Sequence, residues 1–512
     1  MRRALQTLLA LAAAATLTHG ALAANPSSVL ARDAFSDAKA KLASNDGRTR
    51  RAAVGELARV GSAEAWKLVI GALRDSDSQV ADEAQSQLAS VTDPALRELL
   101  LGKDGLEAKE PLVRERVAES FGRLAQRPPS EVLAAGLNDR EASVRRTAAW
   151  SIERLARAGM FREAWERDLV EMSALEAALS AQLAREKDLD TFATLSLSRA
   201  ALLGEPRRAD LDALAAHKSA APRAAAAISA RHAAAPDALE VLRKLAADPS
   251  ASVRINCARS LAALKTASAA RELVALLERE SVLRSKWLYV DHLRALSGLS
   301  HRLDPRPWRA WADALPDGAL AEPAASKADD APATSAFAGL PILSERVLFL
   351  IDLSGSMWDK NSAGRTRKDV VAAELERALR SLSPQVRFNV AVYTARPVAW
   401  KDKLAPASPK AIEEALEFFA KRSDRGPGDF WGAFEFALND AELDTVIVLT
   451  DGAPSGGQRW SLELMQGLFE ERTRLRGVVL EAVLAGASKR LVGHWRTMCG
   501  SSGGRVVEFR LD

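Results

Sequence analysis

Cysteine, tyrosine and histidine are scarce in this chain. Its 512 residues include two cysteines, two tyrosines and six histidines, and aromatic residues make up 5% of the total. The chain has no paired-cysteine spacing and no His-Glu-x-x-His, so two common patterns of zinc sites are missing. Cys257 and Cys499 could form a disulfide only in an oxidising compartment. Because they fall in different predicted domains, we favour two separate buried thiols.

The chain also lacks a strong charge of one sign and long apolar runs. It carries 71 basic and 67 acidic residues, a formal net charge of +4, which is too small to indicate a nucleic-acid partner. Beyond the first residues, no apolar stretch is long enough to cross a bilayer. No glycine-rich loop ends in Lys-Ser or Lys-Thr, so the common nucleotide-binding pattern is missing as well.

The amino terminus is typical of a secretory signal peptide. Arg2 and Arg3 precede an apolar stretch from Leu5 to Leu17, and Ala21-Leu22-Ala23 is a small-x-small cleavage site. We predict a signal peptide over residues 1–23. The mature protein is then exported to the periplasm, the cell surface or the extracellular space, with no transmembrane segment.

From residue 24 to residue 314 the sequence is helical in pattern and repeats itself. A valine, a small or apolar residue four positions later and a larger one eight positions later recur about 31–33 residues apart, a period typical of helical repeats. The frames begin at Val80, Val113, Val144 and Val253; one at Thr49 fits as well, and weaker ones lie at Pro222 and near Thr191.

An aspartate lies five positions before three of these valines, as Asp75, Asp139 and Asp248, and an arginine follows three of them, as Arg114, Arg145 and Arg254. This Asp-x4-Val-Arg-x2-Ala pattern resembles the HEAT repeat family. The resemblance implies a curved all-α solenoid, whose usual use is a protein-binding or scaffolding surface. We expect the aspartates and arginines to cap turns and to pair between repeats.

After Trp308 and Trp311, which we expect to close the last repeat, the composition changes twice. Residues 315–340 are rich in Ala, Pro, Asp and Ser and predict a flexible linker. Residues 341–512 alternate strands with helices, which predicts an α/β domain with a doubly wound, Rossmann-like parallel sheet. Its expected strands are 347–351, 387–393, 445–450, 477–484 and 505–509, and its expected helices begin near 367, 409, 430, 461 and 489.

Two of these strands end in aspartate. Asp352 is followed by Ser354 and Ser356, and Asp451 follows the buried strand 445–450. In an open α/β sheet, ligands bind at the carboxyl ends of the strands. Two carboxylates and two hydroxyls at one edge are oxygen donors suited to a hard divalent cation, Mg²⁺ in the first instance, with Mn²⁺ or Ca²⁺ as alternatives.

The sequence Asp352-Leu353-Ser354-Gly355-Ser356 after an apolar strand resembles the metal-ion-dependent adhesion motif of the von Willebrand factor A family. Thr450-Asp451-Gly452 is similar to the strand end that carries the distal aspartate of that motif. The resemblance covers about the last 170 residues. It implies that an acidic group of a protein partner completes the coordination of the metal.

The chain departs from the family at one ligand. A threonine usually stands in a glycine-rich loop before a helix, and here that position is Gly428, followed by Asp429. Glycine has no side-chain oxygen, so we include Asp429 as a candidate ligand, bound directly or through water. The predicted metal ligands are Asp352, Ser354, Ser356, Asp429 and Asp451.

The sequence therefore predicts an exported, non-enzymatic protein that binds another protein through a metal-dependent site and a helical-repeat surface. One alternative is an envelope scaffold whose metal site is vestigial because of Gly428. Another is a metal-assisted hydrolase using Asp352, Asp429 and Asp451. The chain offers no general base besides these carboxylates, which argues against the hydrolase.

Overall fold

A computed structural model describes residues 26–91, 97–124, 127–323, 335–360 and 364–509. The predicted signal peptide lies outside these ranges. None of the described helices has the length and apolar character needed to span a membrane.

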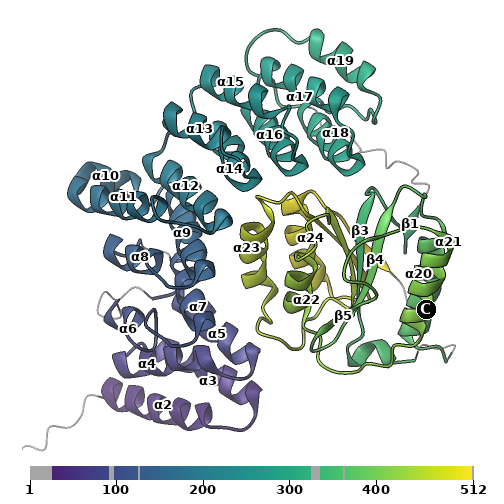
Figure 1. Cartoon of the computed structure of the whole chain (residues 1–512). Helices are drawn as coiled ribbons and strands as arrows, with labels where there is room; N and C mark the ends of the chain where they lie inside the picture. The colour runs from purple at the N-terminus through teal and green to yellow at the C-terminus, as the bar shows by residue number, and fades with distance from the viewer. Residues whose placement is uncertain (1–25, 92–96, 125–126, 324–334, 361–363, 510–512) are drawn as a thin grey trace, which may run out of the picture.

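The amino-terminal half is a curved stack of helices (Figure 1). One row of helices packs against its own neighbours along the length of the stack. This inner row consists of α3 (Gly47–Val60), α5 (Ser78–Leu88), α7 (Pro111–Phe121), α9 (Ala142–Arg157), α12 (Leu189–Leu203), α14 (Ala220–Ala230), α16 (Ala251–Leu264) and α18 (Leu283–Ser297). The remaining helices are α2 (Pro26–Leu42), α4 (Ala63–Gly71), α6 (Arg97–Leu101), α8 (Ser130–Leu137), α10 (Arg162–Arg167), α11 (Leu169–Leu183), α13 (Arg208–Ala215), α15 (Ala235–Leu245), α17 (Ala267–Arg279) and α19 (Pro305–Asp313).

The repeat frame read from the sequence is confirmed by this row. Val80, Val113, Val144 and Val253 lie in α5, α7, α9 and α16 and are at most 2% exposed. The weak frame at Thr191 lies in α12, which packs between α9 and α14. Its register is harder to see in the sequence because an extra helix, α10, separates it from α9.

The charged residues of the repeat hold adjacent units together, as expected. Asp139 accepts from the Glu141 backbone N–H at the turn before α9, and its carboxylate pairs with both ends of the Arg114 guanidinium at 2.6 and 3.0 Å. The pair Arg223–Asp248 repeats this arrangement. Bidentate pairing fixes both the distance and the orientation of neighbouring units.

A similar pair joins the segment before α8 to α11 and makes the solenoid sensitive to acid. Arg127 donates to both Glu171 carboxylate oxygens at 2.7 and 2.9 Å, and the Ser130 N–H donates to one of them. The Arg127 hydrogen bonds lower the pKa of Glu171 to about 2. Because the folded state holds fewer protons than the unfolded state between about pH 4.3 and pH 2, this stabilisation is present above that window and is lost as the pH falls through it.

We therefore expect Glu171→Gln to lower the free energy of unfolding by about 1–2 kcal/mol at pH 7. Urea titrations of both proteins at pH 7, 4 and 2.5 measure the difference. It should shrink steadily at the two lower pH values, because Glu171 becomes protonated first in the unfolded wild type, which stabilises the unfolded state. A difference that stays constant across this range would contradict the ion-pair explanation.

The carboxyl-terminal half is a seven-stranded sheet between helices. The strands run in the order β5-β4-β3-β7-β8-β9, and β6 also pairs with β4. The strands β3 (Arg346–Asp352), β4 (Arg387–Tyr393), β7 (Thr445–Thr450), β8 (Val479–Ala485) and β9 (Val506–Phe509) are parallel, whereas β5 (Pro397–Ala399) and β6 (Ala405–Pro406) are antiparallel to β4. The predicted doubly wound α/β fold is thus observed, with a mixed edge.

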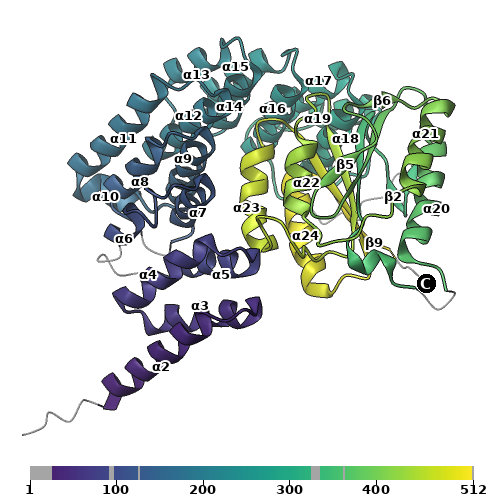
Figure 2. The same cartoon turned by 60° about the horizontal axis from the view of Figure 1, so that its bottom comes forward.

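Helices cover both faces of this sheet (Figure 2). One face packs against α20 (Arg367–Arg380) and α21 (Pro409–Ala420), and the other against α22 (Phe430–Ala437), α23 (Leu462–Thr473) and α24 (Lys489–Ser502). Because side chains of β3 alternate between these two apolar clusters, every residue from Val347 to Asp352 is buried. This explains the continuous apolar run in the sequence.

The predicted linker is ordered at its carboxyl-terminal end. Residues 324–334 lie outside the described ranges, but β1 (Ala336–Phe337) and β2 (Leu340–Pro341) form an antiparallel pair. Phe337 is fully buried and packs edge-on against Phe349 at 5.4 Å between ring centroids. The prediction of a flexible linker is therefore wrong for residues 336–340, because a single aromatic anchor in a small-residue segment outweighs its composition.

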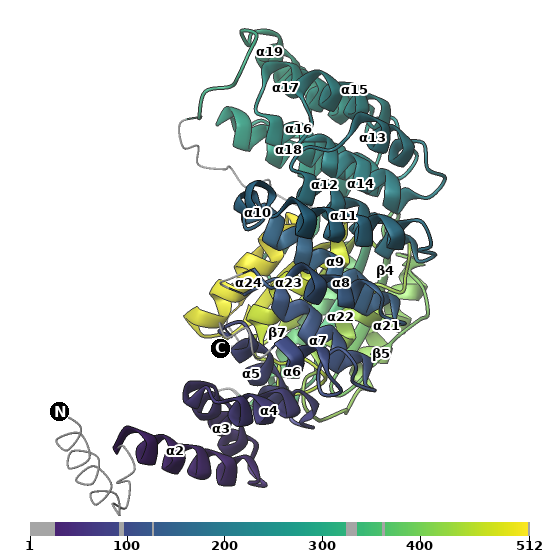
Figure 3. The same cartoon turned by 90° about the vertical axis from the view of Figure 1, so that its left-hand side faces the viewer.

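The sheet domain lies against the concave side of the helical stack, with α23 closest to the inner row (Figures 1 and 2). Figure 3 shows the stack continuing past the sheet domain at both ends. Leu475 and Val479 of the sheet domain belong to the same apolar cluster as inner-row residues such as Val253. The two halves therefore share part of one core, which the sequence did not indicate.

Candidate functional site

The carboxyl ends of β3 and β7 bring the predicted metal ligands together. The two strands are parallel neighbours, so Asp352 and Asp451 follow strands that end at the same edge of the sheet. Ser354 leads into a short 3-10 turn, Gly355–Trp358, which carries Ser356. The Ser356 hydroxyl donates to the Asp451 carboxylate at 2.6 Å, so the two motifs that are 95 residues apart meet directly.

Asp352 is the buried centre of this site. Its side chain is 2% exposed; one carboxylate oxygen accepts from the Ser354 N–H at 2.7 Å, and the other accepts from the hydroxyls of Thr450 at 2.9 Å and Tyr393 at 3.3 Å. Burial raises the pKa of Asp352, against the effect of the Ser354 and Thr450 hydrogen bonds, and the nearby Asp451 charge raises it further.

Thr450 and Tyr393 are functional neighbours that sequence reasoning missed. Both end strands beside β3, and the register pairs Asp352 with Tyr393. Both residues stand at the ends of predicted strands, so the sequence contained a signal that they lie at the same edge of the sheet as Asp352. By holding one carboxylate oxygen, they fix how the Asp352 side chain points.

Gly428 lies beside Asp352 and Ser354. A Cβ atom at this position would lie 3.3 Å from the Ser354 Cβ and 3.5 Å from each Asp352 carboxylate oxygen. Gly428 is therefore next to two of the predicted metal ligands, and it has no side-chain oxygen to add to them.

Asp429 caps the helix that follows it. Its carboxylate accepts from the Gly432 N–H at 2.8 Å and caps the start of α22, and Gly457 packs closely against it. Burial raises the pKa of Asp429, although the Gly432 hydrogen bond opposes this. Within the described part of the chain, no three acidic, histidine or cysteine side chains gather at one point, so Asp429 is not grouped with Asp352 and Asp451.

The remaining donor set still fits a divalent cation. Asp352 and Asp451 bring two negative charges to one edge, and no lysine, arginine or histidine of the described residues pairs with either carboxylate. A buried carboxylate without a positive partner is costly. Two carboxylates and two serine hydroxyls supply four hard oxygens, and Mg²⁺ commonly completes such a set with water.

The two tryptophans beside these loops behave differently. Trp431 is 3% exposed and packs in the core against Phe434. Trp358 is half-buried, with the Arg425 guanidinium 4.6 Å and the Lys368 ammonium 5.5 Å from the centre of its ring. Only Trp358 therefore contributes to the surface next to the metal loops.

The two cysteines lie away from the predicted metal ligands. Cys257 and Cys499 are both free and buried, and burial raises the pKa of each thiol, which confirms two separate thiols.

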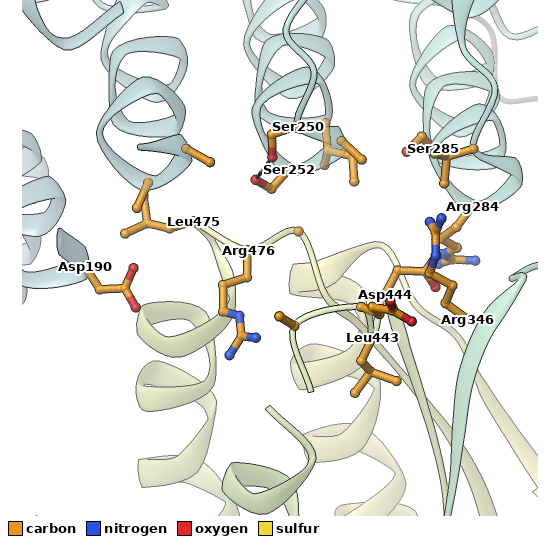
Figure 4. Close-up of a pocket in the computed structure, with 18 of the residues that line it drawn as sticks. Asp190, Ser250, Ser252, Arg284, Ser285, Arg346, Leu443, Asp444, Leu475 and Arg476 are labelled. Atoms are coloured by element: carbon orange, nitrogen blue, oxygen red, sulfur yellow. Dashed lines mark hydrogen bonds between the residues drawn. The ribbon is translucent and has the colours of Figure 1, made fainter. Parts of the chain in front are cut away.

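A cavity of about 520 Å³ separates the start of α16 from the amino-terminal edge of the sheet. In Figure 4, Ser250 and Ser252 face Leu475 and Arg476 across it. It is at the opposite end of β3 from Asp352, because Arg346 lines it.

The fold and the site together define a class of protein. It has an α/β domain in which acidic and hydroxyl groups gather at the carboxyl edge of a parallel sheet. Family models match "HEAT repeats" over residues 210–288 and "von Willebrand factor type A domain" over residues 345–470. The chain therefore contains HEAT repeats followed by a von Willebrand factor type A domain.

Similar curated proteins are inter-alpha-trypsin inhibitor heavy chains. Heavy chain 4 of Mus musculus is 31% identical over 131 residues, 23% of this chain and 13% of that protein. Heavy chain H3 of Bos taurus is 30% identical over 132 residues, 23% of this chain and 14% of that protein. The chain thus covers a small part of the length of these relatives.

Among solved structures, a von Willebrand factor type A protein from Catenulispora acidiphila is 18% identical, with a TM-score of 0.28 over 33% of this chain and 39% of that one. The complex of CpcE and CpcF of phycocyanin lyase from Nostoc sp. PCC7120 is 20% identical, with a TM-score of 0.29 over 54% of this chain and 94% of that one.

Proposed function

We propose that this protein is exported and binds another protein through a divalent cation held at the carboxyl edge of its sheet. Asp352, Ser354, Ser356 and Asp451 hold the cation, Mg²⁺ in the first instance. The observation that carries the proposal is the buried Asp352 carboxylate, which has hydroxyl neighbours and, among the described residues, no basic partner. A bound cation would supply a positive, coordinatively open point that an acidic group of the partner can fill.

The surface beside the site favours an acidic partner. Arg425 and Lys368 lie over Trp358 and bring positive charge next to the metal loops. Opposite charge on the partner would speed association and select against basic partners. Export follows from the amino-terminal sequence, and no catalytic role is assigned to any residue of the site.

A scaffold with a vestigial metal site is the second candidate. It is favoured by Gly428, which offers no side-chain oxygen where the family usually has threonine. In this case the helical repeats alone would bind partners. The sheet domain occupies part of the concave side of the helical stack. The outer helices of the stack and the two ends of the stack would therefore provide the binding surface.

Calorimetric titration of the full chain with Mg²⁺, Mn²⁺ and Ca²⁺ separates these candidates. We expect saturable binding by the wild type. Gly428→Thr should bind about tenfold more tightly, because it adds a neutral oxygen ligand. Gly428→Ala is the matched control: it adds the Cβ without the oxygen and should not tighten binding.

The same titration tests Asp429. Asparagine caps helices as well as aspartate does, so Asp429→Asn should change metal affinity by less than about threefold if the carboxylate only caps α22. A larger loss would restore Asp429 as a ligand, direct or through water. No saturable binding by the wild type would reject the metal site and favour the scaffold.

A further inference from the structure

The loop that carries Asp451 is fastened at two places, and the first is the metal site itself. We call residues 451–461, which connect β7 to α23, the Asp451 loop. At its start Asp451 accepts from Ser356. In its middle, the Ser455 hydroxyl accepts from the Gly428 N–H at 2.8 Å, while the N–H groups of Ser455 and Gly456 donate to the Gly428 carbonyl at 3.1 and 3.2 Å. The loop thus holds Gly428 against the ligands of the metal.

The second fastening point is on the helical repeats. Asp82 of α5 accepts from the backbone N–H groups of Trp460 and Ser461, both at 2.6 Å. Ser461 is the N-cap of α23, so a buried carboxylate sits at the positive end of this helix, where negative charge is favoured. Arg116 of α7 pairs with the other Asp82 oxygen and donates to the Gln458 carbonyl, each at 2.5 Å.

Arg459 of the loop is enclosed by the same two inner helices. It donates to Gln85 of α5 at 2.9 Å and to Glu115 of α7 at 2.8 Å, and its side chain is 1% exposed. Charged hydrogen bonds that are removed from water are strong and directional, and breaking one leaves a buried charge unpaired. The carboxyl-terminal end of the Asp451 loop therefore has little freedom while the repeats are in place.

We propose that the helical repeats are a positioning element of the metal site, with Asp82 as its central positioning residue. The inference rests on the metal site proposed above. Asp82 and Arg116 hold one end of the Asp451 loop, and Ser455 transmits this constraint to Gly428 beside Asp352. Fixing the loop before the cation arrives lowers the conformational entropy lost when the cation binds. By thermodynamic linkage, the cation must in return strengthen the hold of the repeats on the loop.

Two buried carboxylates of the inner row allow a matched test. Asp82 and Glu153 are each 1% exposed and each bonds to the sheet domain, but Glu153 pairs with Arg474, which lies at the opposite end of α23 from the Asp451 loop. Mg²⁺ and Mn²⁺ affinities are measured by calorimetry on the full chain for the wild type, Asp82→Ala and Glu153→Ala. We expect Asp82→Ala to weaken binding about tenfold and Glu153→Ala to change it by less than about twofold, although both lower the melting temperature.

Hydrogen exchange distinguishes a positioning role of Asp82 from a general loss of stability. In the wild type, Mg²⁺ should slow exchange across residues 453–461. In Asp82→Ala this protection should be lost at residues 453–457 as well as at 458–461, whereas Glu153→Ala should retain it. If Asp82→Ala does not fold, Asp82→Asn keeps one oxygen as the acceptor for the two amides but replaces the oxygen that accepts from Arg116 with an amide NH2, and it should weaken binding about threefold.

The outcomes separate the two proposals. Equal metal affinity and equal loop protection in the Asp82 and Glu153 variants, with normal binding by the wild type, would overturn the positioning role and leave the metal site intact. No saturable binding by the wild type would reject the metal site, and the positioning role with it.

Discussion

Replacing Asp352 by asparagine is expected to weaken Mg²⁺ binding by at least about 100-fold and to leave the metal-free protein at least as stable as the wild type. The first effect follows from the loss of a charged ligand at the centre of the site. The second follows from burial, because the wild-type carboxylate is 2% exposed and no basic residue in the described part of the chain pairs with it. Removing its charge removes a desolvation cost.

Asparagine also fits the hydrogen bonds of Asp352. Its carbonyl oxygen can accept from the Ser354 N–H, and its amide can donate to the hydroxyls of Thr450 and Tyr393, because a hydroxyl accepts as readily as it donates. Alanine would leave the Ser354 N–H without its acceptor, so Asp352→Ala should be less stable than Asp352→Asn by about 1–2 kcal/mol.

Calorimetric titration with Mg²⁺ and urea unfolding in the presence of a chelator measure the two effects separately. A metal-free asparagine variant that is several kcal/mol less stable than the wild type would identify Asp352 as a structural residue. Saturable Mg²⁺ binding of wild-type strength by the same variant would remove Asp352 from the proposed ligand set.

The fold was largely predictable because its strongest signals are local. The strands 387–393 and 445–450 are observed as predicted, residue for residue. The first shows alternating β-forming residues (Phe388, Val390 and Val392), and the second is a continuous run of buried side chains. The helix after Ser408 begins as expected, with Ser408 capping it through the Ala411 N–H. Such runs and caps are properties of a few adjacent residues.

The site was predictable only in part. Asp352, Ser354, Ser356 and Asp451 lie at two neighbouring strand ends, which the order of strands and the ligand spacing indicated. The capping role of Asp429 was not predictable, because an aspartate before a helix can cap that helix, as this one does through the Gly432 N–H, or face the site. Position along the chain does not reveal that choice.

Contacts between the two domains could not be predicted at all. Arg116 and Gln458 are 342 residues apart, and Asp82 and Ser461 are 379 apart. In the sequence, the charged residues of the inner helices are indistinguishable from those that pair between repeats, such as Arg114 with Asp139. Only the folded arrangement shows that one set faces the sheet domain.

Glu481 is the clearest example of such a hidden contact, and replacing it by alanine is expected to lower the free energy of unfolding by about 3–5 kcal/mol. Glu481 lies in the middle of β8 and is fully buried. It accepts from Arg505 at 3.0 Å and from Arg284 of α18 at 3.3 Å. Arg284 is itself 2% exposed, so its charge would stay buried without a carboxylate.

Two further variants test whether the loss comes from the stranded charge. Glu508→Ala removes one partner of an exposed ion pair in the same domain and should cost at most about 1 kcal/mol. The double replacement Glu481→Met and Arg284→Met removes both buried charges and should recover most of the stability that Glu481→Ala loses, because apolar side chains of similar size can replace a buried pair. Urea unfolding at pH 7 provides all three values.

If Glu481→Ala costs no more than Glu508→Ala, burial of the Arg284 charge does not hold the two domains in this arrangement. If the double variant is as unstable as the single one, Arg284 contributes through its bond to the Gly503 carbonyl rather than through its pairing with Glu481.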